Sequence, residues 1–473
     1  MKNLKNIDYK WFISIFALII FYTGVFYLYH DKYLPISDFF KYDIAAEIYK
    51  RLLFTGGIEG IDQYSREFYG IEYSSYRLVT ATEKPLYFLL LSMLKLFSPQ
   101  PVGLLFFANM ALLGISIFLI SETLQPANKK VFIILGGIIC SPFIVFQPII
   151  YQPHVLEVFL TCLAVFFFKK EKHFWAFFCI TASIYAHPSN FPLLITFWIY
   201  HIYICKKDWD GYKWALLGSF AWVIAFSSIE SILFTRDSFD LFPHIYQWEN
   251  ILLFKGQRTS GNYSSYPGFI NFWKNSFILV PIATVGLFWI RNKFQFAITL
   301  LPIIIILIAT KFNMAAQRNL LPIYFLTYAY FFCYFLSSNT SKIKKQVCIV
   351  IMALAMGSSL LYHNHVAQCL SIRDETKVSI ERPPVGYSNG GSYDNLLWNM
   401  KRFNQINDNG KIVYSVFKHP ISQPSNIPDP LNFYPYFLTK IIGKFIKPEL
   451  IGIDTTTPRE YSLKKVMKVP EVD

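Results

Sequence analysis

The chain has 473 residues, of which 54% are hydrophobic and 16% charged, with a formal net charge of +14. Its mean hydropathy is +0.35. This composition excludes an ordinary soluble domain, in which about 25% of residues are charged. The basic excess does not indicate a nucleic-acid partner, because much of it lies in breaks between apolar runs, at residues 169–172, 206–207, 291–293 and 342–345. Such breaks are typical of cytoplasmic loops.

Long apolar runs recur from residue 11 to residue 362. Because about 20 apolar residues cross a bilayer, we expect an all-α polytopic membrane protein with about twelve transmembrane helices. The first run has no small-residue cleavage site and is expected to remain as an anchor. The runs define a transmembrane domain, residues 1–362, and a tail, residues 363–473. The candidate spans are residues 11–29, 86–97, 102–121, 131–150, 155–168, 173–186, 191–205, 214–234, 272–290, 294–310, 319–337 and 346–362.

The basic residues also predict sidedness. With the four basic breaks inside the cell, a second outer loop, residues 235–271, and the tail lie outside. With the basic amino terminus inside, the first outer loop, residues 30–84, also lies outside. These two deductions disagree by one span between residues 29 and 169. Either the short run 86–97 or the proline-broken region 131–168 is therefore miscounted.

Residues 38–54 predict an amphipathic helix that lies along the membrane surface in the first outer loop. Glu47 precedes Arg51 by four residues, the favourable order for a helical ion pair. Asp43 and Glu47 are expected on a solvated face rather than in catalysis. The apolar stripe of this helix consists of Ile44, Ile48 and Leu52.

The tail predicts a small extracytoplasmic α/β region. Residues 393–406 have a helical pattern, and residues 411–417 have the alternation and β-branched residues of a strand. An Asn-Gly pair separates them, and several prolines follow, which impose an irregular path.

Three short motifs follow one another along the chain. The first is Asp38-x-x-x-Tyr42-x-x-x-Ala46, directly after the first span. The second is Glu-Lys-Pro-Leu-Tyr at residues 83–87, and the third is Gln-Arg-Asn-Leu-Leu-Pro at residues 317–322. In order and spacing they resemble the GT-C superfamily of integral membrane glycosyltransferases. The second acid, second proline and tyrosine that many relatives carry in these motifs are replaced here by Phe39, Leu86 and Asn319.

This resemblance implies an inverting glycosyltransferase of the bacterial inner membrane. A polyprenyl-phosphate-linked sugar would be its donor, and a glycan, lipid or protein at the outer face its acceptor. A carboxylate is needed as base, for which Asp38 is the catalytic candidate, and cations are needed beside the leaving phosphate. The candidate substrate-binding residues are Lys84, Arg318, Arg258, Tyr42 and Asp43.

The sequence shows no clear metal motif. Its seven cysteines have no paired spacing, so neither a disulfide framework nor a cysteine metal site is expected. The resemblance leaves a divalent metal open. His154 and His187, which lie beside prolines, are expected to be structural, and Glu157 is expected to face the bundle interior or a span end rather than take part in chemistry.

Structural interpretations compete with the functional ones. Asp38 could cap the surface helix, and Lys84 and Arg318 could anchor span ends at the interface. Two other functions also stay open. A transporter of lipid-linked sugars typically shows matching halves with broken spans, which are not found here. An O-antigen-type polymerase or ligase uses the same substrates, and it would make Arg258 central and Asp38 dispensable.

Overall fold

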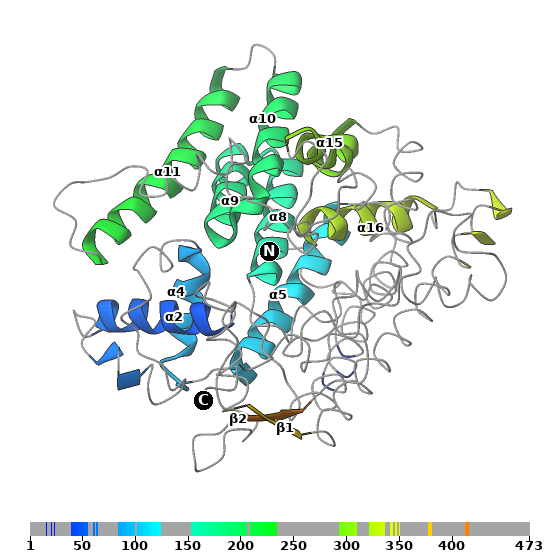
Figure 1. Ribbon diagram of the computed structural model, residues 1–473. Helices are drawn as coiled ribbons and strands as arrows, with labels where there is room; N and C mark the ends of the chain where they lie inside the picture. The colour runs from blue at the N-terminus through cyan, green and yellow to red at the C-terminus, as the bar shows by residue number, and fades with distance from the viewer. Residues whose placement is uncertain are drawn as a thin grey trace.

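A computed structural model describes residues 39–54, 60–61, 63–64, 84–99, 102–123, 153–205, 209–233, 293–309, 321–335, 341–343, 346–347, 377–380 and 412–415, with residues 16, 20, 23 and 350. This part of the chain is mainly helical (Figure 1). Its helices are α2 (Phe39–Phe54), α4 (Pro85–Leu94), α5 (Val102–Thr123), α8 (His154–Lys169), α9 (His173–Ala186), α10 (Phe191–Cys205), α11 (Trp209–Leu233), α15 (Lys293–Ala309) and α16 (Leu321–Phe335), and a 3-10 turn, η6 (Pro188–Asn190), links α9 to α10.

The helical prediction is confirmed for the described residues. Every predicted apolar range that falls among them contains a helix, although range 86–97 ends in a turn after Leu94. Ranges 11–29, 131–150, 272–290 and 346–362 lie outside the described residues apart from isolated positions. One described helix, Gly103–Thr123 within α5, is long and apolar enough to cross a membrane, and shorter apolar helices accompany it at Pro85–Leu94, His173–Ala186, Phe191–Ile204 and Lys293–Ile305. The count of about twelve spans stays a prediction.

The centre of the bundle is the hairpin of α8 and α9. Its turn is a Schellman motif, in which the Lys172 N–H donates to the Phe167 carbonyl at 2.9 Å and the Glu171 N–H donates to the Phe168 carbonyl at 3.1 Å. Glu171 has a φ of 59°, a left-handed conformation that favours glycine. The basic break at residues 169–172 is therefore a tight turn, which makes α8 and α9 antiparallel neighbours.

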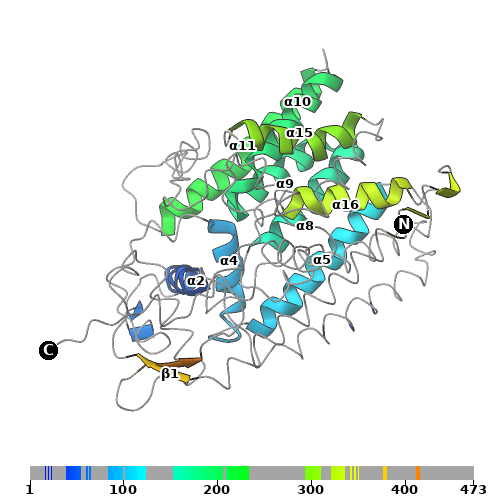
Figure 2. The same cartoon turned by 45° about the vertical axis from the view of Figure 1, so that its right-hand side comes forward.

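Helices α5 and α11 cover the two sides of this hairpin. α5 packs against α8, and α11 packs against α9 (Figures 1 and 2). The contact between α9 and α11 is close at Gly218, where a Cβ atom would lie 2.2 Å from the Phe174 carbonyl oxygen. A small residue at this point lets the two helix backbones approach each other, as is common between membrane helices.

The α2–α4 pair and a short β-ribbon lie beside the bundle core. α2 packs against α4, and α4 in turn packs against α9. A two-stranded antiparallel ribbon is formed by β1 (Lys377–Ile380) and β2 (Ile412–Ser415), with Lys377 opposite Ser415. β2 falls inside the predicted strand 411–417, so that prediction is confirmed, while the predicted helix 393–406 lies outside the described residues. Both views show the ribbon beyond the α2 end of the molecule.

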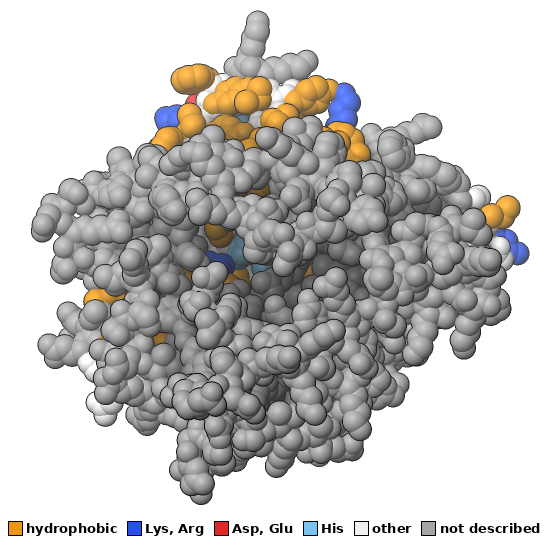
Figure 3. Space-filling model, viewed as in Figure 1, with side chains coloured by type: hydrophobic (Ala, Val, Ile, Leu, Met, Phe, Trp, Pro, Cys, Tyr) orange, Lys and Arg blue, Asp and Glu red, His pale blue; other side chains and the backbone are white. Residues whose placement is uncertain are grey.

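Apolar side chains are exposed on the outer helices. Figure 3 shows them together with lysines at the end where α10 gives way to α11. Trp209 is 77% exposed there, and further along α11 the exposed side chains are Trp214, Leu216, Leu217, Phe220 and Ile224. This face of α11 is therefore apolar and exposed, with aromatic residues at the end near α10.

Candidate functional site

The surface helix of the prediction is α2, but its environment differs from the one expected. Residues 42–49 are all buried, including Asp43 at 0% and Glu47 at 3% exposure. The expectation that Asp43 and Glu47 form a solvated face is therefore wrong. The two carboxylates can be buried because Lys95, which follows α4, brings a compensating positive charge to both.

Lys95 is the centre of a buried ion network between α2 and α4. Its Nζ lies 2.8 Å from Asp43 Oδ1 and 3.6 Å from Glu47 Oε2. It also donates to the Tyr64 hydroxyl at 2.6 Å and to the Pro99 carbonyl at 2.9 Å. Tyr64 in turn donates to Asp43 Oδ2 at 2.6 Å. Removing one partner of such a buried pair typically costs about 3–5 kcal/mol, so this network locks α2 onto α4.

The predicted pair of Glu47 and Arg51 is present at the edge of this network. Arg51 Nε donates to Glu47 Oε1 at 3.0 Å, and Lys50 Nζ lies 3.9 Å from Glu47 Oε2. Both basic side chains are partly exposed, at 26% and 29%. Their contribution is consequently small compared with that of the buried pair.

The other end of α4 brings two of the sequence motifs together. Lys84 precedes α4 as its N-cap, and its Nζ lies over the ring of Tyr42, 4.5 Å from the centroid. The ring centroid of Tyr42 also lies 5.7 Å from that of Tyr87, in a T-shaped pair, and 5.8 Å from that of Phe88, in a tilted pair. Lys84 is 8% exposed. The first and second motifs thus form one aromatic and cationic cluster.

The structure does not describe the other three predicted site residues. Asp38, Arg258 and Arg318 lie outside the described residues. Of the predicted set, the structure brings together Tyr42, Asp43 and Lys84 on the contact between α2 and α4. The carboxylate of Asp43 is occupied by Lys95 and Tyr64, while its proposed contact with substrate stays a prediction.

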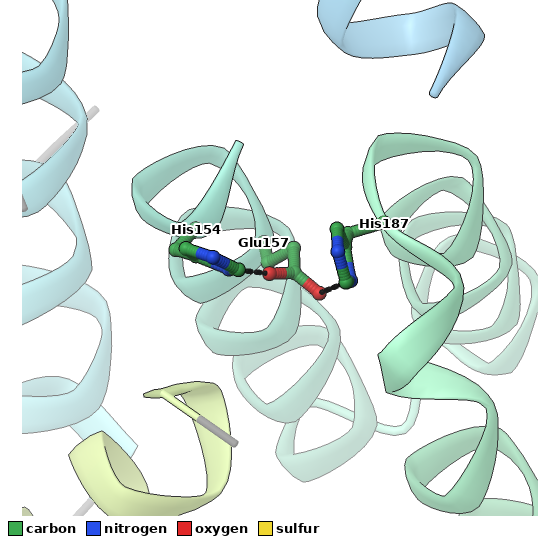
Figure 4. Close-up of side chains that lie close together, drawn as sticks. All are labelled: His154, Glu157 and His187. Carbon is green, nitrogen blue, oxygen red and sulfur yellow. Dashed lines mark hydrogen bonds and ion pairs between the residues drawn. The ribbon is translucent and has the colours of Figure 1, made fainter. Parts of the chain in front are cut away.

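A second buried cluster lies at the open end of the α8–α9 hairpin (Figure 4). His154 Nδ1 is 2.7 Å from Glu157 Oε2, and His187 Nδ1 is 3.6 Å from Glu157 Oε1. Glu157 is fully buried in the first turn of α8, as expected for a residue at the bundle interior or at a span end. Sequence analysis predicted a structural role for each histidine separately and did not predict that the two lie together. The sequence does contain one sign of their contact: His154 and His187 are nearly equally far from the turn at residues 170–172, so an antiparallel hairpin brings them side by side.

Two lysines stack on aromatic rings at the end of the bundle that the basic residues predict to be cytoplasmic. Lys169 Nζ lies 4.5 Å from the ring centroid of Phe294, and partial burial lowers the pKa of Lys169. A hydrogen bond to the Tyr203 hydroxyl raises the pKa of the exposed Lys293. Both lysines therefore lie against aromatic rings near the α8–α9 turn and the start of α15.

No protein-family model, curated protein or solved structure matches the chain.

Proposed function

We propose that this protein is a membrane glycosyltransferase that moves a sugar from a polyprenyl-phosphate-linked donor to an acceptor at the outer face of the membrane. The observation that carries the proposal is the contact between Tyr42 and Lys84. These residues belong to two motifs that the GT-C resemblance places at the start and the end of one outer loop. Their contact supports a shared site, because it brings the two ends of that loop together in space.

Lys84 has the charge and position to receive the leaving phosphate. Negative charge develops on that phosphate as the glycosidic bond breaks, and a fixed cation stabilises it. Lys84 stands at the amino-terminal end of α4, with no side-chain cap on the helix. The positive end of the helix dipole therefore adds to the lysine charge and favours an anion there.

Asp38 is the proposed base. It immediately precedes α2, and it lies four residues before Tyr42 in the sequence. In the proposed reaction the acceptor hydroxyl or amine attacks the anomeric carbon, and Asp38 takes the proton that the acceptor loses. The bond from the anomeric carbon to the phosphate oxygen breaks in the same step, and the phosphate leaves on its lipid.

The exposed apolar faces of α5 and α11 support a membrane location. Leu104, Phe107, Ile115 and Phe118 on α5 are each at least 38% exposed, on the helix whose length suffices to cross a membrane. A water-soluble protein rarely leaves such surface uncovered. Lipid contact on these faces would let the donor's polyprenyl tail remain in the bilayer while its phosphate reaches the protein.

The geometry of α4 also bears on sidedness. α4 has ten residues and is about 15 Å long, half of the roughly 30 Å hydrocarbon core. The lysines at both of its ends contact α2. We infer that α4 is not a complete span and that residues 86–97 are the miscounted run. The two predictions of sidedness then agree, with α2 and the tail both outside the cell.

The proposal is tested by a transfer assay on the purified full-length protein with a polyprenyl-phosphate sugar. Asp38→Asn keeps the shape and the helix-capping ability of the side chain but removes the base. We expect transfer to fall by about 10²–10⁴-fold, the usual contribution of such a group, with little change in donor binding. If Asp38 only caps α2, the variant would be nearly silent, because Asn caps as well as Asp.

Arg258→Ala separates the proposal from the polymerase or ligase alternative. In that alternative Arg258 is central and Asp38 is dispensable, so Arg258→Ala would abolish the reaction while Asp38→Asn would not. The glycosyltransferase proposal requires the reverse ranking of the two variants. Near-normal transfer by Asp38→Asn would remove its central residue.

A further inference from the structure

We propose that His154, Glu157 and His187 bind one Zn²⁺ ion, which clips the open end of the α8–α9 hairpin. This site is separate from the glycosyl-transfer function proposed above and does not depend on it. Each of the three residues offers one ligand atom, and these atoms all lie within 4.8 Å of one another. They come from the first turn of α8 and the end of α9 (Figure 4).

The donor set suits zinc. Two imidazole nitrogens and one carboxylate are a ligand combination that zinc uses when it keeps a fourth position for water or another ligand. His154 and Glu157 are three residues apart on one helix, so both side chains are on the same face. His187 approaches the same carboxylate from the opposite side (Figure 4), and the rings of His154 and His187 have centroids 5.1 Å apart.

The three ligand atoms lie within 4.8 Å of one another, so accepting the ion requires them to approach by up to about 1.5 Å. Ligand atoms around a tetrahedral zinc ion lie about 3.3–3.5 Å apart, given metal–ligand distances near 2.0–2.1 Å. The separation of His187 Nδ1 and Glu157 Oε1 is already 3.6 Å. The separation of His154 Nδ1 and Glu157 Oε2 is 2.7 Å, the length of a hydrogen bond. Zinc binding would replace this hydrogen bond by separating the two atoms by less than about 1 Å.

Burial of the cluster favours a bound cation. Glu157 is fully buried and His154 is 2% exposed, and a buried carboxylate is costly unless a cation compensates its charge. Zinc would supply that charge and would take both imidazoles as neutral ligands. His187 is 12% exposed at its side chain, so of the three residues it lies nearest the solvent.

The position of the site explains what zinc would do there. The Schellman turn at Glu171 already closes one end of the hairpin. A zinc ion between His154 and His187 would close the other end and stabilise the folded hairpin, because this site forms only when the chain is folded. Leu86 of α4 packs against the cluster of Tyr185 and Val223. Tyr185 lies two residues before His187, so the clip would also fix the surface on which α4 rests.

The test is zinc binding by the full-length protein in detergent, after treatment with a chelator and its removal. We expect about one tightly bound zinc ion per chain and a thermal midpoint that rises with zinc concentration. His187→Gln should weaken zinc binding by at least about 100-fold and abolish the rise, since loss of even an outer-shell partner costs 10–100-fold. The matched control is His201→Gln, because His201 is also buried and its ring lies 4.7 Å from that of His173.

Cobalt binding to the wild-type protein is a second test of the site, and it does not depend on whether a variant folds. Co²⁺ in this site should give the visible absorption of a four-coordinate nitrogen and oxygen site, and added Zn²⁺ should displace it. The proposal is overturned if the folded wild-type protein binds no stoichiometric zinc or cobalt. It is also overturned if zinc binding persists in His187→Gln or if His201→Gln loses it to the same extent.

Discussion

Lys84 and Lys95 stand at the two ends of one short helix, α4, and both reach α2, but they meet different chemistry there. Lys95 is 1% exposed and contacts Asp43, Glu47 and a backbone carbonyl. Lys84 lies over the ring of Tyr42 at the amino-terminal end of the helix. Lys95 follows the carboxyl end, where the helix dipole favours a cation; the amino end, beside Lys84, favours an anion.

A charged residue beside an apolar helix can therefore have either a structural or a functional role, and its partners decide between the two. The charge of Lys95 is already neutralised by carboxylates of the fold, so it is suited to hold α2 in place. The charge of Lys84 lies over an aromatic ring and beside a helix amino terminus, where the helix dipole favours an anion. We therefore assign Lys95 to stability and Lys84 to phosphate binding, and the following predictions test this division.

The largest expected effect is the loss of the Lys95 charge. In Lys95→Met the buried carboxylate of Asp43 keeps Tyr64 as a donor but loses its cation. We expect the free energy of unfolding to fall by about 3–5 kcal/mol, as for other buried pairs that lose one partner. Thermal unfolding of the purified protein in detergent measures this.

The control for Lys95→Met is the double variant Asp43→Asn, Lys95→Met. It leaves no unpaired charge, so it should be more stable than Lys95→Met alone. If Lys95→Met loses no more than about 1 kcal/mol, which is typical of a surface pair, the network does not hold α2 and the division between the two lysines fails.

A smaller effect is expected at Tyr42, whose ring connects Lys84 to the aromatic residues of α4. Tyr42→Leu removes the cation–π contact and two ring contacts. We expect a loss of about 1–2 kcal/mol in stability, together with weaker donor binding. Tyr42→Phe keeps the ring and should resemble the wild-type protein in both measurements. An equal defect in both variants would instead assign the role to the hydroxyl.

The smallest effect is expected at Arg51. Its side chain is 26% exposed and pairs with Glu47 across one helical turn, while Lys95 also lies near that carboxylate. Arg51→Gln should cost only about 0.3–0.5 kcal/mol, and the difference from wild type should shrink further in high salt. A loss comparable to that of Lys95→Met would show that the edge of the network matters as much as its buried centre.

Sequence periodicity predicted the helices well but predicted their environment poorly. The helix over residues 38–54 appears as α2, because helical spacing of apolar residues is a local property. The burial of Asp43 depends on Lys95, which lies 52 residues away in sequence, and no local pattern contains that contact. The His154, Glu157 and His187 cluster was missed for the same reason, since it exists only once α8 and α9 fold back on each other.

The most direct test of the account is sugar transfer by Lys84→Met, measured beside its thermal stability. We predict that transfer from the polyprenyl-phosphate donor falls by about 10²–10³-fold, as when one preorganised charge partner of a transition state is removed. The affinity for the donor should fall too, Lys84→Arg should retain much of both, and thermal unfolding should change far less than in Lys95→Met. Near-wild-type transfer and donor binding by a folded Lys84→Met protein would contradict the assignment of Lys84 to the leaving phosphate.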